Sequence, residues 1–156
     1  NNGYRRTLTG LEWQPFPPEQ IRVLGALIKD IARRYGIAPE NIVGHSDIAP
    51  QRKQDPGPRF PWRQLAEQGI GAWPDPQRVA FYLAGQHRDA AVPVATVLDR
   101  LQRYGYEVTE GMSANQQRNL IAAFQMHFRP ANYQGLADAE TLAIAEALLE
   151  KYGEAQ

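Results

Sequence analysis

The sequence contains no cysteine among its 156 residues, so disulfide bonds and thiolate chemistry are excluded. It also lacks any apolar run that approaches the roughly 20 residues needed for a helix to cross a bilayer. Neither sign of charge dominates, because 17 basic residues balance 17 acidic ones. A neutral chain offers no broad electrostatic reason to bind nucleic acid or anionic lipid, and we expect no nucleic-acid partner.

The composition that remains is typical of a folded globular protein, with 43% hydrophobic and 22% charged residues. This length permits one ordinary domain or two small ones. The sequence begins with Asn1 rather than Met and shows no basic-then-apolar signal segment. We therefore expect that a preceding part of the protein has been removed or is absent.

The first third of the chain predicts one long amphipathic helix. Pro18 suits the first helical position, where its missing N–H would have no partner in any case. Apolar residues then recur at intervals of three and four, and Gly36 is placed to end the helix in a left-handed conformation. Before the helix, turn chemistry at Asn2-Gly3 and Gly10 indicates the end of a strand. The predicted apolar face comprises Ile21, Leu24, Ile28, Ile31 and Tyr35.

A short strand is expected over residues 40–45, as the second half of an α/β unit. The following stretch, SDIAPQRKQDPGPRFPW, is rich in proline and predicts a long irregular loop. A loop of this length directly after a strand is often functional. A short helix should follow from Pro61, with Gly69 at its end.

Beyond Trp73-Pro74-Asp75-Pro76 the sequence predicts helices and connectors only. After a short helix over residues 77–84, three longer helices should form a compact bundle. The first of these ends at Gly105, the second begins with a capping box at Ser113, and Asp138 caps the third. The expected division is therefore residues 1–74, a linker over 75–86 that holds the short helix, and a helical domain over 87–156.

His45 and Asp55 are the residues that suggest chemistry, since they lie ten positions apart across the proline-stiffened loop. Imidazole and carboxylate both suit zinc, and a catalytic zinc keeps three protein ligands plus a water. On spacing alone the pair is ambiguous, because a strand-end histidine is often structural and an aspartate before proline often forms a turn. Lys53 would project to the same side as Asp55 in an extended backbone, or it is a solvated surface lysine.

Residues 44–57 read Gly-His-Ser-Asp-Ile-Ala-Pro-x-Arg-Lys-x-Asp-Pro-Gly, followed by Phe-Pro-Trp and Leu-Ala-Glu-Gln-Gly-Ile-Gly. This pattern resembles the zinc-dependent N-acetylmuramoyl-L-alanine amidases of the type-2 amidase family, and the resemblance covers essentially the whole chain. It implies that His45 and Asp55 bind Zn²⁺ and that Lys53 stabilises an oxyanion. It also implies hydrolysis of the amide between N-acetylmuramic acid, or its anhydro form, and L-alanine, with peptidoglycan fragments or muropeptides as substrates.

The sequence departs from the family pattern in one respect. The family also uses a first zinc histidine and a glutamate general base, both on strands before the long helix, and neither is present here. Glu12 and Glu19 are expected in a turn and at the helix start, His87 in an exposed connector, and His127 as a packed or surface residue. We therefore expect an incomplete site that an N-terminal fragment of the same enzyme completes.

The resemblance further implies the fold class and the location of the enzyme. The fold should be α/β, the C-terminal portion of a mixed-sheet amidase domain followed by a small three-helix bundle. Similarity to lipoprotein members of the family implies the periplasm, with an outer-membrane anchor in an N-terminal segment that this sequence does not contain.

The helical tail resembles the peptidoglycan-binding type-1 domain. Its tyrosines Tyr104, Tyr106 and Tyr133 either stack on sugar rings or fill the small core. Two other functions stay open: a non-catalytic peptidoglycan-recognition protein, which the missing histidine and glutamate permit, and a helical adaptor, which no feature specifically favours.

Overall fold

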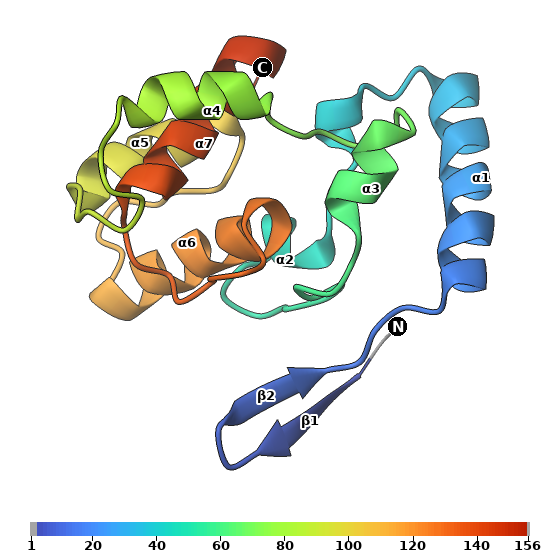
Figure 1. The fold of residues 1–156 in the computed structure, drawn as a ribbon, viewed down its shortest axis with the longest axis horizontal. Helices are drawn as coiled ribbons and strands as arrows, with labels where there is room; N and C mark the ends of the chain where they lie inside the picture. Colours follow the sequence, from blue (N-terminus) through green and yellow to red (C-terminus); the bar gives the residue numbers. More distant parts are fainter. Residues whose placement is uncertain (1–2, 156) are drawn as a thin grey trace.

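The computed structural model describes residues 3–155 as a mixed α/β arrangement in which helices predominate (Figure 1). Strands β1 (Tyr4–Thr7) and β2 (Gly10–Trp13) form an antiparallel hairpin in which Tyr4 lies opposite Trp13. The remaining elements of these residues are the helices α1 (Pro18–Tyr35), α2 (His45–Ile48), α3 (Trp62–Glu67), α4 (Pro76–Leu83), α5 (Val94–Tyr104), α6 (Ala114–Phe128) and α7 (Ala139–Tyr152), with a 3-10 turn at Pro39–Asn41.

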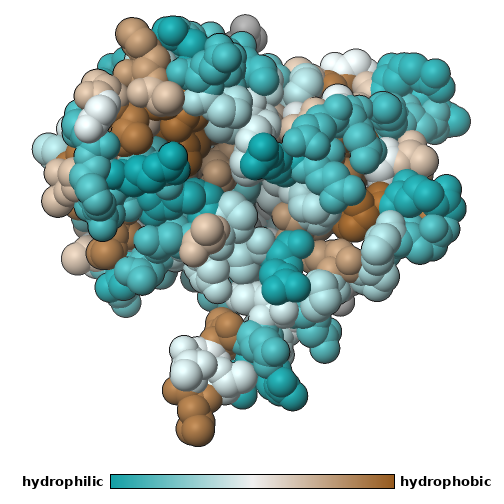
Figure 2. Space-filling model, viewed as in Figure 1, coloured by the Kyte–Doolittle hydropathy of each residue, from teal (hydrophilic) through white to brown (hydrophobic). Residues whose placement is uncertain are grey.

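The hairpin extends away from the body of the protein, and apolar side chains gather at its free end (Figures 1 and 2). The sequence indicated only the end of one strand here, so the return strand β2 was missed. Asn2, where a turn was expected, lies outside the described residues. Among residues 3–155 no helix is long and apolar enough to cross a membrane.

The prediction of a strand over residues 40–45 is wrong. Pro39–Asn41 form a 3-10 turn, residues 42–44 have no regular structure, and His45 begins the single helical turn α2. A strand needs a neighbour to accept and donate its backbone hydrogen bonds, and the described residues offer none at this place. The presence of α2 also corrects the expectation that the whole following loop is irregular.

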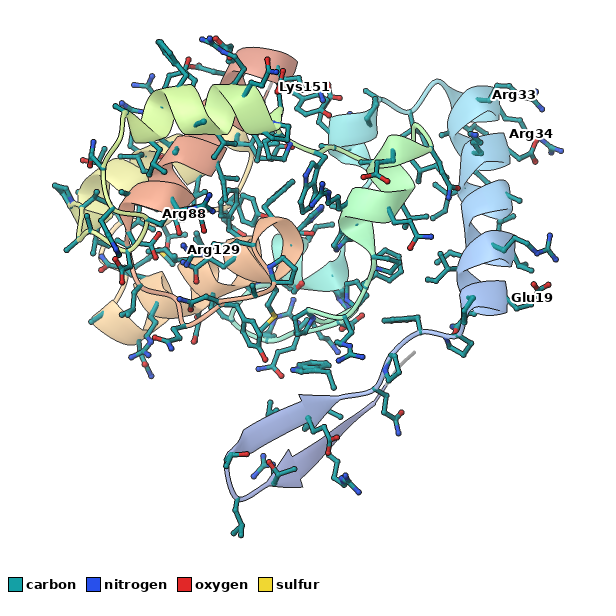
Figure 3. All side chains as sticks on the ribbon, in the orientation of Figure 1. Glu19, Arg33, Arg34, Arg88, Arg129 and Lys151 are labelled. Carbon is teal, nitrogen blue, oxygen red and sulfur yellow. The ribbon has the colours of Figure 1, made fainter. Side chains whose placement is uncertain are left out.

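Helix α1 confirms the prediction of its start and end. It begins at Pro18, and Gly36 adopts the left-handed conformation with φ of 64°. Ile21, Leu24 and Ile28 pack against a core built around Phe60, Trp62, Leu65 and Ile70. The apolar stripe is shorter than predicted, because the helix runs past this core and leaves Ile31 and Tyr35 exposed. Glu19, Arg33 and Arg34 point away from the protein on the outer side of α1 (Figure 3).

The second core lies among the helices of the tail. Residues of α5, α6 and α7 surround Phe124, which is fully buried. The predicted caps are confirmed, since the Ser113 hydroxyl accepts the Gln116 N–H at 3.1 Å and Asp138 accepts the Thr141 N–H at 2.9 Å. The short helix α4 packs along α7, where Arg78 pairs with Glu150 at 2.7 Å. Four helices therefore pack together, so the three-helix bundle is not confirmed, and the division at residue 75 stays a prediction.

The two cores are joined at Trp73, whose side chain packs against both. Its backbone is held by α7, because the Trp73 N–H donates to the Tyr152 hydroxyl at 3.0 Å and Lys151 Nζ donates to the Trp73 carbonyl at 2.9 Å. Helix α6 also contacts α2 and α3. The tail is thus packed directly on the segment that carries His45.

Candidate metal centre

The loop from Gly44 to Gly57 doubles back on itself and brings its two ends together. The Ser46 N–H donates to the Asp55 carbonyl at 2.9 Å, which ties the start of α2 to the far end of the loop. Within the loop, the Lys53 N–H donates to the Ala49 carbonyl at 2.9 Å. A segment that looks irregular in sequence is therefore held by a small set of backbone hydrogen bonds.

Two glycines allow the close approaches that shape this loop. A Cβ at Gly44 would lie 2.5 Å from Pro56 Cδ, so the backbone entering α2 passes directly against the proline that follows Asp55. At Gly57 φ is 84°, and a Cβ there would lie 2.6 Å from the Trp13 ring. A side chain at Gly44 would push the two ends of the loop apart, and one at Gly57 would push the loop away from the hairpin.

The fold places His45 and Asp55 side by side. His45 Nδ1 lies 3.4 Å from Asp55 Oδ2, and the two side chains are 49% and 45% exposed. Two ligands of one tetrahedral zinc, each bound at about 2.05 Å, are separated by about 3.3 Å. The observed separation matches this value, so the pair fits one zinc ion. No third histidine, cysteine or carboxylate of residues 3–155 joins them to form a three-ligand group.

Lys53 lines the same pocket as Asp55. This pocket, of about 520 Å³, is also lined by the aromatic side chains of Tyr4 and Trp13 from the hairpin. The Trp13 indole is buried, yet its Nε1 has no hydrogen-bond partner among the described residues. The pocket therefore brings together a cation, a carboxylate and an unused donor.

The helical tail contributes to the same pocket through Asn119 of α6. Asn119 Nδ2 donates to Gln51 Oε1 at 3.1 Å, and Gln51 Nε2 donates to the Gln116 carbonyl at 2.8 Å. These side-chain contacts fasten the loop to α6 a few residues before Lys53.

The other candidates from the sequence lie elsewhere. His87 is exposed and contacts Asp89, as expected for a connector. Glu19 begins α1 and contacts Arg22. Glu12 was expected in a turn but lies in strand β2, where it pairs with Arg5 at 2.6 Å. Because side chains alternate along a strand, Glu12 faces away from the side on which Trp13 meets the loop.

Asp47 was not predicted from the sequence, yet it accepts three hydrogen bonds next to the site. Its carboxylate accepts the Gly44 N–H at 2.8 Å, the His127 Nδ1–H at 2.8 Å, and the Tyr106 hydroxyl. Burial opposes ionisation of this carboxyl, but His127 and the hydrogen bonds outweigh it and hold its pKa below the usual range. The contact with Gly44 is local, but no spacing pattern could have revealed the other two, because His127 lies in α6 and Tyr106 follows the end of α5.

His127 is a packed residue, as expected, and is only 3% exposed. Its ring is stacked between those of Trp62 and Phe128, with both centroid distances at 3.9 Å. Tyr106 is buried in the tail core, and burial raises the pKa of its hydroxyl well above the ordinary value. Tyr106 therefore fills the core, which is one of the two roles that the sequence left open for it.

Comparison with known proteins places the chain in a class. Residues 1–58 match the family model described as N-acetylmuramoyl-L-alanine amidase. Over nearly its whole length the chain is also similar in sequence to one N-acetylmuramoyl-L-alanine amidase. The chain therefore resembles N-acetylmuramoyl-L-alanine amidases both in a family model over its first 58 residues and in one relative over nearly its whole length, which confirms the resemblance seen in the sequence.

The individual relatives are these. The chain is 60% identical over 154 residues to the N-acetylmuramoyl-L-alanine amidase AmiD of Escherichia coli, which covers 99% of this chain and 56% of AmiD. The solved complex of that AmiD with anhydro-N-acetylmuramic acid-L-Ala-D-gamma-Glu-L-Lys matches with a TM-score of 0.96 and 59% identity, over 98% of this chain and 60% of the other. AmpDh3 of Pseudomonas aeruginosa matches with a TM-score of 0.88 and 44% identity, over 97% and 59%. The chain thus spans little more than half the length of these relatives.

Proposed function

We propose that this chain forms part of a zinc-dependent hydrolase that cleaves the amide between N-acetylmuramic acid, or its anhydro form, and L-alanine. The observation that carries the proposal is the 3.4 Å separation of His45 Nδ1 and Asp55 Oδ2, which suits two ligands of one zinc. The solved AmiD complex supports the substrate class, because its ligand is an anhydro-N-acetylmuramic acid peptide.

In this proposal His45 and Asp55 hold the zinc ion at the mouth of the pocket that Lys53 lines. When bound, zinc lowers the pKa of a coordinated water toward about 7 and so supplies hydroxide at neutral pH. As the water oxygen bonds to the amide carbon, negative charge develops on the former carbonyl oxygen, to which the Lys53 ammonium donates a hydrogen bond. When the C–N bond breaks, the L-alanine nitrogen takes up the proton that the water gave up, so that a carboxylic acid and a free amine result.

Metal analysis of the assembled enzyme tests the ligand assignment. His45→Ala or Asp55→Ala should abolish stoichiometric zinc, since each removes one direct ligand. His87→Ala is the matched control, because the side chain of this exposed histidine contacts Asp89 in a connector of the tail, and its removal should leave zinc unchanged. Full zinc content in Asp55→Ala would contradict the assignment.

The role of Lys53 is tested separately from metal binding. Lys53→Ala should keep zinc but lower kcat by about 10²–10³-fold, the usual effect of removing one oxyanion donor. Lys29→Ala, on the exposed side of α1, should leave kcat unaltered. An unchanged kcat in Lys53→Ala would remove this residue from the mechanism.

The proposed site still needs a third ligand and a general base, and we assign both to an N-terminal part of the same enzyme. An unpartnered apolar stripe on α1 supports such a partner: Val23, Leu27 and Ile31 are 53%, 54% and 39% exposed at intervals of four residues. A stripe of this kind normally packs against other protein. The proposed N-terminal part covers this stripe and meets the hairpin.

Two charge substitutions test the proposed assembly. Leu27→Glu should release the N-terminal part and abolish activity, because it places a charge in the centre of the apolar stripe. Leu136→Glu, at an exposed leucine between α6 and α7, should have no effect on either. The assembled mass is read by native mass spectrometry. Activity in a preparation that contains only this polypeptide would overturn the assignment.

Location and tail function are part of the same proposal. A peptidoglycan amide as substrate supports a location in the periplasm, and an outer-membrane anchor would belong to the proposed N-terminal part. Cell fractionation tests both.

We also propose that the tail, over residues 87–156 after the linker 75–86, binds glycan. A groove of about 540 Å³ near the linker, lined by Trp73 and Tyr152, supports aromatic contact with sugars. A pull-down with insoluble peptidoglycan tests this binding, and we expect the chain to be enriched in the pellet.

The alternative is a non-catalytic peptidoglycan-recognition protein. The observation in its favour is that only two metal-binding side chains meet at the site among residues 3–155. Zinc content decides between the two, because a recognition protein would be folded and free of stoichiometric metal.

A further inference from the structure

Asp47 connects the candidate metal centre to the helical tail through three hydrogen bonds to one carboxylate. One comes from the Gly44 N–H, directly before His45, and the other two come from Tyr106 and His127 in the tail. These partners are 59 and 80 residues away in the sequence. The carboxylate is buried, so each of its bonds is exchanged for water only at considerable cost.

The tail holds its two donors rigidly. The His127 ring has one face against Trp62 and the other against Phe128, at interplanar angles of 15° and 8°. The Tyr106 ring packs edge-on against Phe124 in the tail core, with ring centroids 5.7 Å apart. Neither donor can follow a displaced carboxylate without disturbing this packing.

The turn that carries His45 has little stability of its own. Helix α2 contains four residues, and a first helical turn is intrinsically unfavourable because it orders several residues for one hydrogen bond. That bond runs from the Ala49 N–H to the His45 carbonyl at 2.9 Å. Apart from the Ser46–Asp55 backbone hydrogen bond, the turn is held in place by Asp47, and Asp47 is held by the tail.

We propose that Tyr106 and His127 are positioning residues: through Asp47 they hold α2 so that His45 stays in register with Asp55 for a shared metal ion. This inference rests on the proposed function as far as the metal is concerned, but the hold on α2 is a property of the chain alone. The tail then has a role in the metal centre that is independent of any glycan binding.

The first experiment uses the metal-free full chain and measures amide hydrogen exchange at Ala49. Tyr106→Phe removes only the hydroxyl and keeps the packed ring, so exchange at Ala49 should become about 10-fold faster or more. Tyr152→Phe is the matched control, because it removes a partly buried tyrosine hydroxyl that binds Trp73 instead of Asp47. Equal exchange at Ala49 in both variants would overturn the inference.

His127→Asn and His127→Leu form a second pair. The asparagine amide can donate to Asp47 from the place of Nδ1–H and should largely restore slow exchange, whereas leucine cannot donate at all. A role in packing alone predicts that leucine, the larger apolar side chain, is tolerated at least as well as asparagine. Faster exchange in the asparagine variant than in the leucine variant would therefore contradict the proposal.

The second experiment uses the assembled zinc enzyme. Tyr106→Phe should weaken zinc binding about 10-fold in competition with a chelator, near the lower end of losses seen when partners of metal ligands are removed. It should also lower kcat with little change in KM, since both tail residues are buried, while Tyr152→Phe changes neither. A wild-type enzyme without zinc would sink the proposed function and this role with it. Zinc bound equally tightly by wild type and Tyr106→Phe would sink the positioning role alone.

Discussion

Gly57→Ala should destabilise the chain far more than its backbone conformation alone requires. At Gly57 φ is 84°, and an added Cβ would lie 2.6 Å from Cε3 and from Cζ3 of Trp13. Gly69 has nearly the same φ, 81°, but nothing lies within 4 Å of its added Cβ. The two positions therefore share the backbone strain and differ only in the contact with the indole.

The magnitudes follow from these two terms. A left-handed conformation costs a non-glycine residue about 1–2 kcal/mol, so Gly69→Ala should lower the free energy of unfolding by that amount. Overpacking against a rigid ring adds about 1–3 kcal/mol. Trp13 cannot swing away freely, because it is buried and packs against Tyr4 with ring centroids 5.2 Å apart. Gly57→Ala should therefore cost about 2–5 kcal/mol in total.

Urea unfolding of both variants, followed by far-ultraviolet circular dichroism, measures the difference. The expected gap between them is about 1–3 kcal/mol, with Gly57→Ala the less stable. Equal losses would show that the approach of the hairpin to the loop contributes nothing, and the description of this side of the pocket would have to be abandoned.

Three further predictions concern the tail. Asp138 is buried, yet Arg129 and the hydrogen bonds from Thr141 hold the pKa of its carboxyl below the ordinary 3.8. The carboxylate therefore stabilises the folded chain above pH 3.8, and this contribution is lost as the pH falls through the lower pKa of the folded state. Asp138→Asn should flatten the loss of stability seen in urea unfolding between about pH 4 and pH 2, and an unchanged slope would refute this. Phe124→Ala should cost about 3–5 kcal/mol by creating a cavity in the core, and a loss below 1 kcal/mol would show that the core is not closed there. Ser113→Ala should cost about 1 kcal/mol in thermal unfolding by removing the cap of α6, whereas Ser113→Thr should retain most of it.

The ends of the helices could be predicted because their signals are local. Pro18, Gly36, Ser113 and Asp138 each act within a few residues, and all four occupy the predicted positions. The extent of the apolar face on α1 could not be predicted, since it depends on where the neighbouring core ends. The prediction of a strand over residues 40–45 failed for a related reason, because a strand forms only beside a partner strand that the local sequence does not reveal.

The candidate site was predicted in part. The motif indicated His45, Lys53 and Asp55, and the loop brings the first and last within 3.4 Å, but their roles stay predictions. Asp47 lies inside the same motif and went unnoticed, because its partners Tyr106 and His127 are distant in sequence. Networks of this kind depend on tertiary packing and leave no periodic signal.

Arg129 and Arg88 illustrate a second network of this type. Arg129 pairs with Asp138 at 2.7 Å, and Arg88 pairs with Glu140 at 2.6 Å, so both arginines meet the start of α7 (Figure 3). Only the cap itself, Asp138, could be predicted from its place before the helix.

The shared position of Trp73 has a consequence for protein engineering. A graft of the helical tail onto an unrelated hydrolase, joined at residue 75, would leave this indole behind and deprive each core of a packing surface. The graft would also separate Tyr106 and His127 from Asp47, so the transplanted tail would carry two hydrogen-bond donors without their acceptor. A transplantable unit would have to include the turn at residues 44–48 as well as the tail, so the segment that can be exchanged between proteins is larger than the helices themselves.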